Sequence, residues 1–151
     1  MTEADVDSVM VGADKMGERF KFKDSGRVIL SSLELDTTSG KQFIHWQRCF
    51  GSLKVNSDYG NDSTNNGLNG PVLVSMGSGV NKAKATANQA VMFVEVVYDY
   101  KPIVPLDYLG YTNRTLRFTA AFNVRERTNY VLYNAKNLTG TAFASCTVYA
   151  A

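Results

Sequence analysis

Four segments of this chain alternate between apolar and polar residues, and this period of two constrains the fold more than any other feature. The four segments are 27–36, 42–50, 90–100 and 115–127. Successive side chains of a β-strand point to opposite faces, so the pattern predicts strands with one buried and one solvated face. Only a short turn separates the first two segments, which predicts an antiparallel hairpin.

The two later segments indicate which residues belong to each face. In 90–100, Glu95 and Asp99 mark one face as solvated, and the opposite apolar face is expected to be buried. The segment 115–127 alternates most regularly, and its inward residues are predicted to be Leu116, Phe118, Ala120, Phe122 and Val124. A last strand is predicted near the end of the chain, over 142–149.

A helix is predicted ahead of the strands, over residues 2–17. Thr2 or Asp5 suits its N-cap, because a side-chain oxygen there can accept from a free backbone N–H group. Apolar residues recur at helical spacing and are expected to form one packing face: Val6, Val9, Met10 and Ala13. A helix followed by looping strands predicts a single α+β domain over 1–151, with an N-terminal helix and an antiparallel sheet.

The charge balance argues against a nucleic-acid partner. The chain has 151 residues and a net charge of +2, and no run of Lys or Arg stands out. A protein that binds a phosphate backbone needs a basic patch, so no nucleic acid is expected among the partners. The acidic start also disfavours a viral coat subunit, for which a basic arm is expected.

Catalytic chemistry finds little support among the residue types. His45 is the only histidine, and it lies four residues before Cys49 on the same predicted strand. Residues at this separation on a strand are about 13 Å apart, too far for a nucleophile to contact its base. We therefore expect that the protein is not an enzyme, and we assign no catalytic residue.

Residues 56–71 are rich in Asn, Asp, Ser and Gly, which predicts a long surface loop. Calcium accepts hard oxygen donors of this kind, and the candidate ligands are Asp58, Asn61 and Asp62. Their spacing departs from that of an EF-hand, so no cofactor is expected. The alternative function for the chain is a β-rich extracytoplasmic module that binds calcium or a glycan through this loop.

Two cysteines, Cys49 and Cys146, lie far apart in the chain. Their spacing suits neither a zinc pair nor a redox CxxC motif. The cysteine count alone leaves two possibilities open, which are one long-range disulfide in an oxidising compartment or two buried thiols.

Three stretches, taken in order, resemble a bacterial protein family. They are IHWQRCFGSLKVNSDYG (44–60), AVMFVEVVYDYKPIVP (90–105) and AAFNVRERTNY (120–130), followed by a cysteine near the end. The ordered set resembles the extracytoplasmic domain of TadE/TadF-like minor pseudopilins, proteins of the bacterial tight-adherence (Tad/Flp) pilus machinery. The similarity extends over nearly the whole chain from Thr2 onward.

The resemblance implies a pilin-like head and a structural or assembly role in a tight-adherence type IV pilus. Such proteins begin with a basic leader and an apolar membrane helix, which this chain lacks, so a head without its helix is expected. The resemblance places that head at the periplasmic or extracellular face of the inner membrane, or within the pilus. This oxidising setting favours a disulfide between Cys49 and Cys146.

The partners implied by the resemblance are other pilus subunits, assembly-platform proteins and, through the missing helix, the inner membrane. Aromatic residues and arginine are common anchors in protein interfaces. The residues expected to make partner contacts are therefore Tyr59, Tyr108, Tyr111, Arg125 and Arg127.

Overall fold

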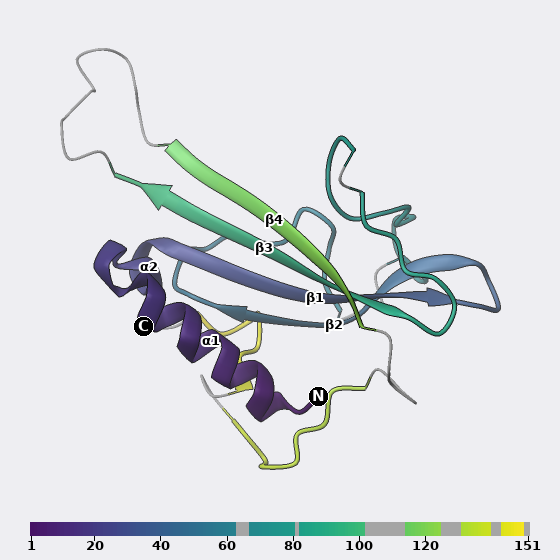
Figure 1. Cartoon of the computed structure of the whole chain (residues 1–151), viewed down its shortest axis with the longest axis horizontal. Helices are drawn as coiled ribbons and strands as arrows, with labels where there is room; N and C mark the ends of the chain where they lie inside the picture. The colour runs from purple at the N-terminus through teal and green to yellow at the C-terminus, as the bar shows by residue number, and fades with distance from the viewer. Residues whose placement is uncertain (63–66, 81, 102–113, 125–130, 140–142, 150–151) are drawn as a thin grey trace.

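In the residues that the structure describes, helices are followed by four antiparallel strands (Figure 1). The computed structural model describes residues 1–62, 67–80, 82–101, 114–124, 131–139 and 143–149. The helices are α1 (Glu3–Gly17), the 3-10 turn η1 (Glu18–Phe20) and α2 (Phe22–Ser25), and the strands are β1 (Gly26–Asp36), β2 (Lys41–Phe50), β3 (Ala90–Tyr100) and β4 (Arg114–Val124). The predicted α+β fold is thereby confirmed.

Helix α1 begins where the sequence predicts. The Thr2 hydroxyl accepts from the Asp5 backbone N–H at 3.3 Å, and the Thr2 N–H donates to the Asp5 carboxylate at 2.7 Å. This reciprocal capping box satisfies two donors that the first helical turn leaves free. Val6 and Met10 are buried against the sheet, whereas Val9 is exposed and does not belong to the packing face as predicted. Among the described helices, none is long and apolar enough to cross a membrane.

The strands are ordered β2-β1-β3-β4, and every neighbouring pair is antiparallel. The predicted hairpin is β1 with β2. Its register shifts between Ser32 and Leu33, where Ser32 faces Trp46 and Leu33 faces Ile44, so His45 is an extra residue in β2. Such a bulge sends the side chains on its two sides to opposite faces. Trp46 and Ile44 accordingly belong to different core clusters.

Two apolar cores lie on the two faces of the sheet. On one face, α1 packs over a cluster containing Val6, Met10, Val28, Leu30, Trp46, Ala90, Met92 and Ala144. On the other face, loop residues Leu73, Met76 and Ala85 cover a second cluster with Leu33, Ile44, Val91 and Phe93. Because both faces are covered, β1 is buried from Gly26 to Glu34, and the prediction of a half-buried strand is wrong for β1.

Two further predictions about burial and strands are wrong. Glu95 does not mark a solvated face, because the segments that follow β2 cover this side of β3 and bury its side chain completely. The described residues 143–149 form turns and no strand, although the Ala144 carbonyl accepts from the Cys49 N–H at 2.7 Å. Side-chain contacts, described below, hold this segment to the sheet.

Candidate functional site

Strand β4 shows an apolar face to solvent. Leu116, Phe118 and Phe122 keep 39%, 64% and 53% of their surface exposed, and Ala120 between them is exposed as well. These four residues, which we call the β4 face, were predicted to point inward, and for them that prediction is wrong. Val124, at the end of the strand, is half-buried against the α1 core.

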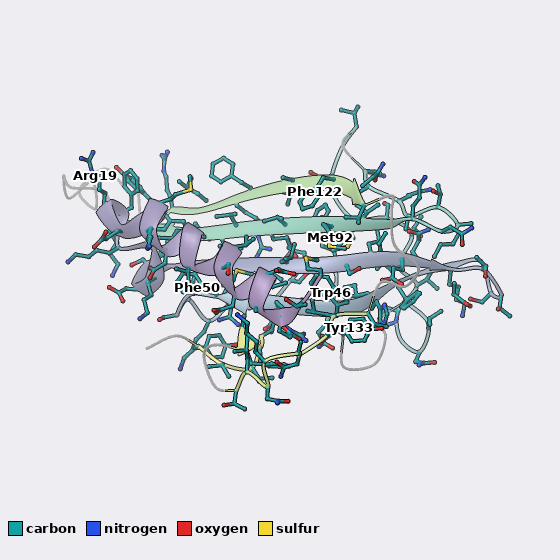
Figure 2. All side chains as sticks on the ribbon, turned by 60° about the horizontal axis from the view of Figure 1, so that its bottom comes forward. Arg19, Trp46, Phe50, Met92, Phe122 and Tyr133 are labelled. Atoms are coloured by element: carbon teal, nitrogen blue, oxygen red, sulfur yellow. A yellow bond between two sulfur atoms is a disulfide. The ribbon has the colours of Figure 1, made fainter. Side chains whose placement is uncertain are left out.

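The reason for this exposure is the position of α1. Leu116, Phe118 and Phe122 lie opposite Tyr98, Val96 and Met92 of β3, so the β4 face continues the side of the sheet that α1 packs on. In Figure 2, α1 crosses the part of the sheet that carries Trp46 and Phe50, whereas Phe122 lies on β4 beyond it. Within the described part of the chain, therefore, α1 and the short α2 cover β1, β2 and part of β3 and leave β4 bare.

An exposed row of aromatic and aliphatic side chains is a feature of interaction surfaces. Solvent-exposed apolar residues are ordinary when they are scattered, but a contiguous group marks a site for a partner. Phenylalanine buries a large area when it is covered by another protein. The β4 face is thus the strongest candidate for a contact surface among the described residues.

The opposite side of β4 carries a charged cluster. The Arg117 guanidinium lies 3.0 Å from the Glu95 carboxylate and 3.1 Å from the Asp58 carboxylate. Glu95 also accepts a hydrogen bond from the Ser57 hydroxyl and, at 3.3 Å, one from the Asp58 backbone N–H. These contacts fasten the loop after β2 to both β3 and β4. The cluster explains why a carboxylate can lie fully buried in β3.

The buried Glu95 predicts a dependence of stability on pH. Burial raises the pKa of its carboxyl above the ordinary value, although the bonds from Ser57 and Asp58 and the charge of Arg117 oppose this rise. Between the unfolded pKa, about 4.3, and the raised folded pKa, the native state holds a proton that the unfolded state has lost. The contribution of Glu95 to stability should therefore fall as the pH rises through this window.

The substitution Glu95→Gln tests this dependence, because its amide is neutral at every pH. Urea unfolding of both proteins between pH 3 and pH 8 is the measurement. We expect the variant to gain in stability relative to the wild type as the pH rises above about 4. Below that pH the Glu95 carboxyl is protonated in both the folded and the unfolded protein. The difference in stability between the variant and the wild type should therefore be constant there. Curves that stay parallel over the whole range would contradict the assignment.

Two of the three predicted calcium ligands, Asp58 and Asp62, pair with arginines. Asp58 pairs with Arg117, and the Asp62 carboxylate accepts from the Gln47 backbone N–H at 2.8 Å and lies 3.4 Å from the Arg48 guanidinium. Among the described residues, no group of three His, Cys, Asp or Glu side chains could hold a metal ion. Calcium binding through Asp58, Asn61 and Asp62 stays a prediction, and these ion pairs would compete with it.

Cys49 and His45 are not arranged as a nucleophile and its base. Cys49 is bonded to Cys146, so it carries no free thiol. The His45 ring nitrogen Nδ1 lies 2.8 Å from a Glu34 carboxylate oxygen, and this hydrogen bond raises the pKa of His45. The disulfide that the resemblance implies is present, and it joins β2 to the C-terminal segment.

The segment around Trp46 contributes structural contacts that the sequence did not reveal. Arg48 donates to both oxygens of the buried Glu3 carboxylate, and its Nε lies 2.8 Å from one of them. Gln47 donates to the Ser31 hydroxyl at 2.9 Å and to the Gly60 carbonyl at 3.1 Å. Successive residues of β2 therefore hold the start of α1, the neighbouring strand and the following loop.

Arg27 is a second residue that sequence reasoning missed. Its side chain is 1% exposed, and its guanidinium donates to the carbonyls of Gly51, Cys146 and Val148 at 2.6, 2.7 and 3.3 Å. The Tyr149 ring lies over it, with the guanidinium carbon 4.3 Å from the ring centroid. In the sequence, Arg27 is visible only as an arginine at the start of an apolar strand. That pattern does not show which distant carbonyl groups accept its hydrogen bonds.

The conformation of Gly51 makes this arrangement possible. Its φ of +103° is one that residues with a side chain rarely adopt, and an added Cβ would lie 2.2 Å from the Gly26 carbonyl oxygen. A glycine is therefore required where the chain leaves β2 and turns its carbonyl toward Arg27.

The structure places one of the five residues predicted to contact partners. Tyr59 is half-buried, and its ring packs edge-on against Phe93 with 5.3 Å between centroids, so it helps to cover the second core. Tyr108, Tyr111, Arg125 and Arg127 lie outside the described residues, and their role stays a prediction.

Comparisons of the chain with protein-family models, with curated proteins and with solved structures found no match. Any assignment of function must therefore be supported by the residues of this chain and their arrangement.

Proposed function

We propose that this protein is a structural or assembly subunit of a bacterial tight-adherence pilus, similar to the TadE/TadF-like minor pseudopilins. It would act through contacts with other pilus subunits and with assembly-platform proteins, and not through catalysis. The observation that carries the proposal is the β4 face on a head whose N-terminal helix packs along one part of an antiparallel sheet. Such a head has a surface ready for a neighbour beside its own helix.

The disulfide supports a location outside the cytoplasm. Disulfides form and persist in oxidising compartments such as the periplasm and are rare in the reducing cytosol. The Cys49–Cys146 bond therefore favours the periplasmic or extracellular setting that a pilus subunit needs. In that setting the head would lie at the outer face of the inner membrane or within the fibre.

The residues that carry the family resemblance support the proposal in a second way. Trp46, Gln47, Arg48 and Cys49 each hold a different part of the head together. Glu95 of the second stretch binds the loop after β2. Residues that hold several parts of a domain together specify its fold. The resemblance of these residues to the TadE/TadF-like pattern therefore favours a similar head structure.

Removal of the aromatic side chains from the β4 face tests the proposal. We expect the double substitution Phe118→Ser, Phe122→Ser, made in the native gene of the source bacterium, to reduce surface pili at least about tenfold. Large aromatic residues at the centre of an interface contribute most of its binding energy. Electron microscopy of cells and immunoblots of sheared pili would measure the effect.

A matched control is available in Val72 and Val74, which are also largely exposed but lie in the loop between β2 and β3. Serine at both positions should leave pili at the wild-type level. Thermal unfolding followed by circular dichroism should show that both double variants are folded at the growth temperature, so a loss of pili in one of them reports a lost contact. Normal pili in a strain that lacks the gene would overturn the proposed function.

A further inference from the structure

The outer edge of β4 has no partner strand within the described part of the chain. The strand is the last in the order of the sheet. Among the described residues, the backbone of Thr115–Val124 forms its strand pairing with β3 alone. A strand edge of this kind presents a row of N–H and C=O groups that can pair with another strand. Edge pairing is also a common way in which one protein recognises another.

The opposite edge of the sheet, at β2, is contacted by other parts of the chain. The Gln47 N–H donates to Asp62, the Cys49 N–H donates to the Ala144 carbonyl, and Gln42 forms a bridge with Leu73. The chain itself thus occupies the β2 edge at three positions. At the β4 edge, by contrast, no described segment pairs with Thr115–Val124.

Strand β4 also lacks most of the devices that keep edges from pairing. Proteins protect an edge with charged side chains, lysine above all, or with proline, a bulge or a very short strand. β4 is 11 residues long, contains no lysine, proline or glycine, and pairs with β3 in an unbroken register from Arg114 to Val124. Its central charge, Arg117, is engaged by Glu95 and Asp58. The edge is therefore regular, and from Thr115 to Val124 no segment that the structure describes pairs with it.

We propose that β4 pairs antiparallel with β4 of a second copy of this chain, about a two-fold axis that passes through Thr119. Thr119 is the middle residue of the strand, so this register pairs all of β4. An axis perpendicular to the sheet keeps the same face of both copies on one side. Contacts across such an axis occur twice, which doubles the value of each favourable pair.

The side chains of β4 are complementary in this register. Phe118 lies opposite the partner's Ala120, a large residue against a small one. Leu116 lies opposite the partner's Phe122, an apolar pair of the kind that stabilises neighbouring strands. Arg117 lies opposite the partner's Ala121, so no two charges of like sign face each other. The two β4 faces then become one continuous apolar surface between the two α1 helices.

This self-pairing rests on the proposed function and adds to it a specific partner for β4, a second copy of the chain. It can be tested with the purified chain alone, without a pilus assay. A standard interface buries about 1,600 Å², and one strand pair buries less, so we expect a dissociation constant of about 1–100 μM. Sedimentation equilibrium should show a monomer–dimer exchange in this range. A chain that stays monomeric at its highest soluble concentration would overturn the self-pairing and leave the pilus proposal standing.

A pair of single-cysteine variants tests the register. In Thr119→Cys, the two new thiols face each other across the axis with Cα atoms about 4.5–5.5 Å apart, which suits a disulfide. The matched control is Thr115→Cys, on the same side of the same strand. Its cysteine lies opposite the partner's Asn123, about 27 Å from its symmetry mate.

Mild oxidation should form a covalent dimer of Thr119→Cys at least about tenfold faster than of Thr115→Cys, because paired thiols meet at a high effective concentration. Mass spectrometry of proteolytic fragments should place the new bond between the two copies of residue 119 and find Cys49–Cys146 intact. Circular dichroism would check that both variants are folded. Equal rates for the two variants would overturn the proposed register.

Discussion

Replacement of both Cys49 and Cys146 by alanine is expected to lower the free energy of unfolding by about 2–5 kcal/mol. The bond joins residues 97 positions apart, and a cross-link around so long a loop removes much of the freedom of the unfolded chain. A domain of this size has about 5–15 kcal/mol of stability in total, so the loss is a large fraction of it. Urea unfolding with far-UV circular dichroism would measure the change.

The reduced wild-type protein provides the control for this prediction. Reduction followed by alkylation in denaturant removes the same cross-link without changing residues elsewhere, and refolded protein should show a loss of similar direction. The intact mass of the untreated protein, with and without alkylation, reports whether the two thiols are bonded. Two freely alkylated cysteines in protein purified from an oxidising compartment, or an unchanged unfolding curve for the double alanine variant, would contradict the prediction.

The sequence predicted the elements well because their signals are local. The N-cap at Thr2, one of the two residues proposed for it, and the period-two segments depend on residues within a few positions of one another. The bounds of β3 match the predicted segment 90–100, and the hairpin of β1 with β2 follows from a short turn. Such features need no knowledge of how the strands are ordered in the sheet.

The assignment of buried and exposed faces failed for the opposite reason. Alternation shows that the two faces of a strand differ, but it does not show what covers them. β1 and β3 lie in the middle of the sheet, so their polar residues Ser31, Ser32 and Glu95 are buried. β4 lies at the edge that α1 does not cover, so Phe118 and Phe122 are exposed, whereas Trp46 of the other edge strand, β2, is buried. The segments that cover each strand decide both outcomes, and this coverage is set by contacts between distant parts of the chain.

The candidate site was predictable only in part for the same reason. The alternating apolar residues of the β4 face could be recognised in the sequence. Whether they are exposed depends on how far α1 extends across the sheet, which the sequence pattern does not show. The disulfide followed from the family resemblance and not from the spacing of Cys49 and Cys146. The partners of Glu95 and Arg27 come from loops and from the C-terminal segment, at separations that no local pattern reports.

The second large effect is expected from Arg27→Met. Methionine keeps most of the apolar volume but removes the guanidinium, which leaves the carbonyls of Gly51, Cys146 and Val148 without their donor. Gly51 is buried, whereas Cys146 and Val148 are half-buried and can bind water instead. A buried polar group that loses its partner costs about 1–3 kcal/mol and a half-buried one costs less, so we expect a loss of about 2–4 kcal/mol. Denaturant unfolding measures it. The matched control is Arg19→Met, because Arg19 is exposed and its loss should cost about 0.5 kcal/mol or less.

Arg27 and the disulfide hold the same C-terminal segment, so their effects should not add. Once the Cys49–Cys146 bond is absent, the segment that carries the Cys146 and Val148 carbonyls is held by Arg27 and by the contacts of Ala144 with β2 and the α1 core. It should detach locally more easily when Arg27 is removed too. A double-mutant cycle that combines Arg27→Met with both alanine substitutions should therefore give a coupling energy of about 0.5–3 kcal/mol. Strict additivity would mean that Arg27 stabilises β1 and Gly51 independently of the C-terminal segment. It would also mean that the disulfide alone is sufficient to fix the end of the chain.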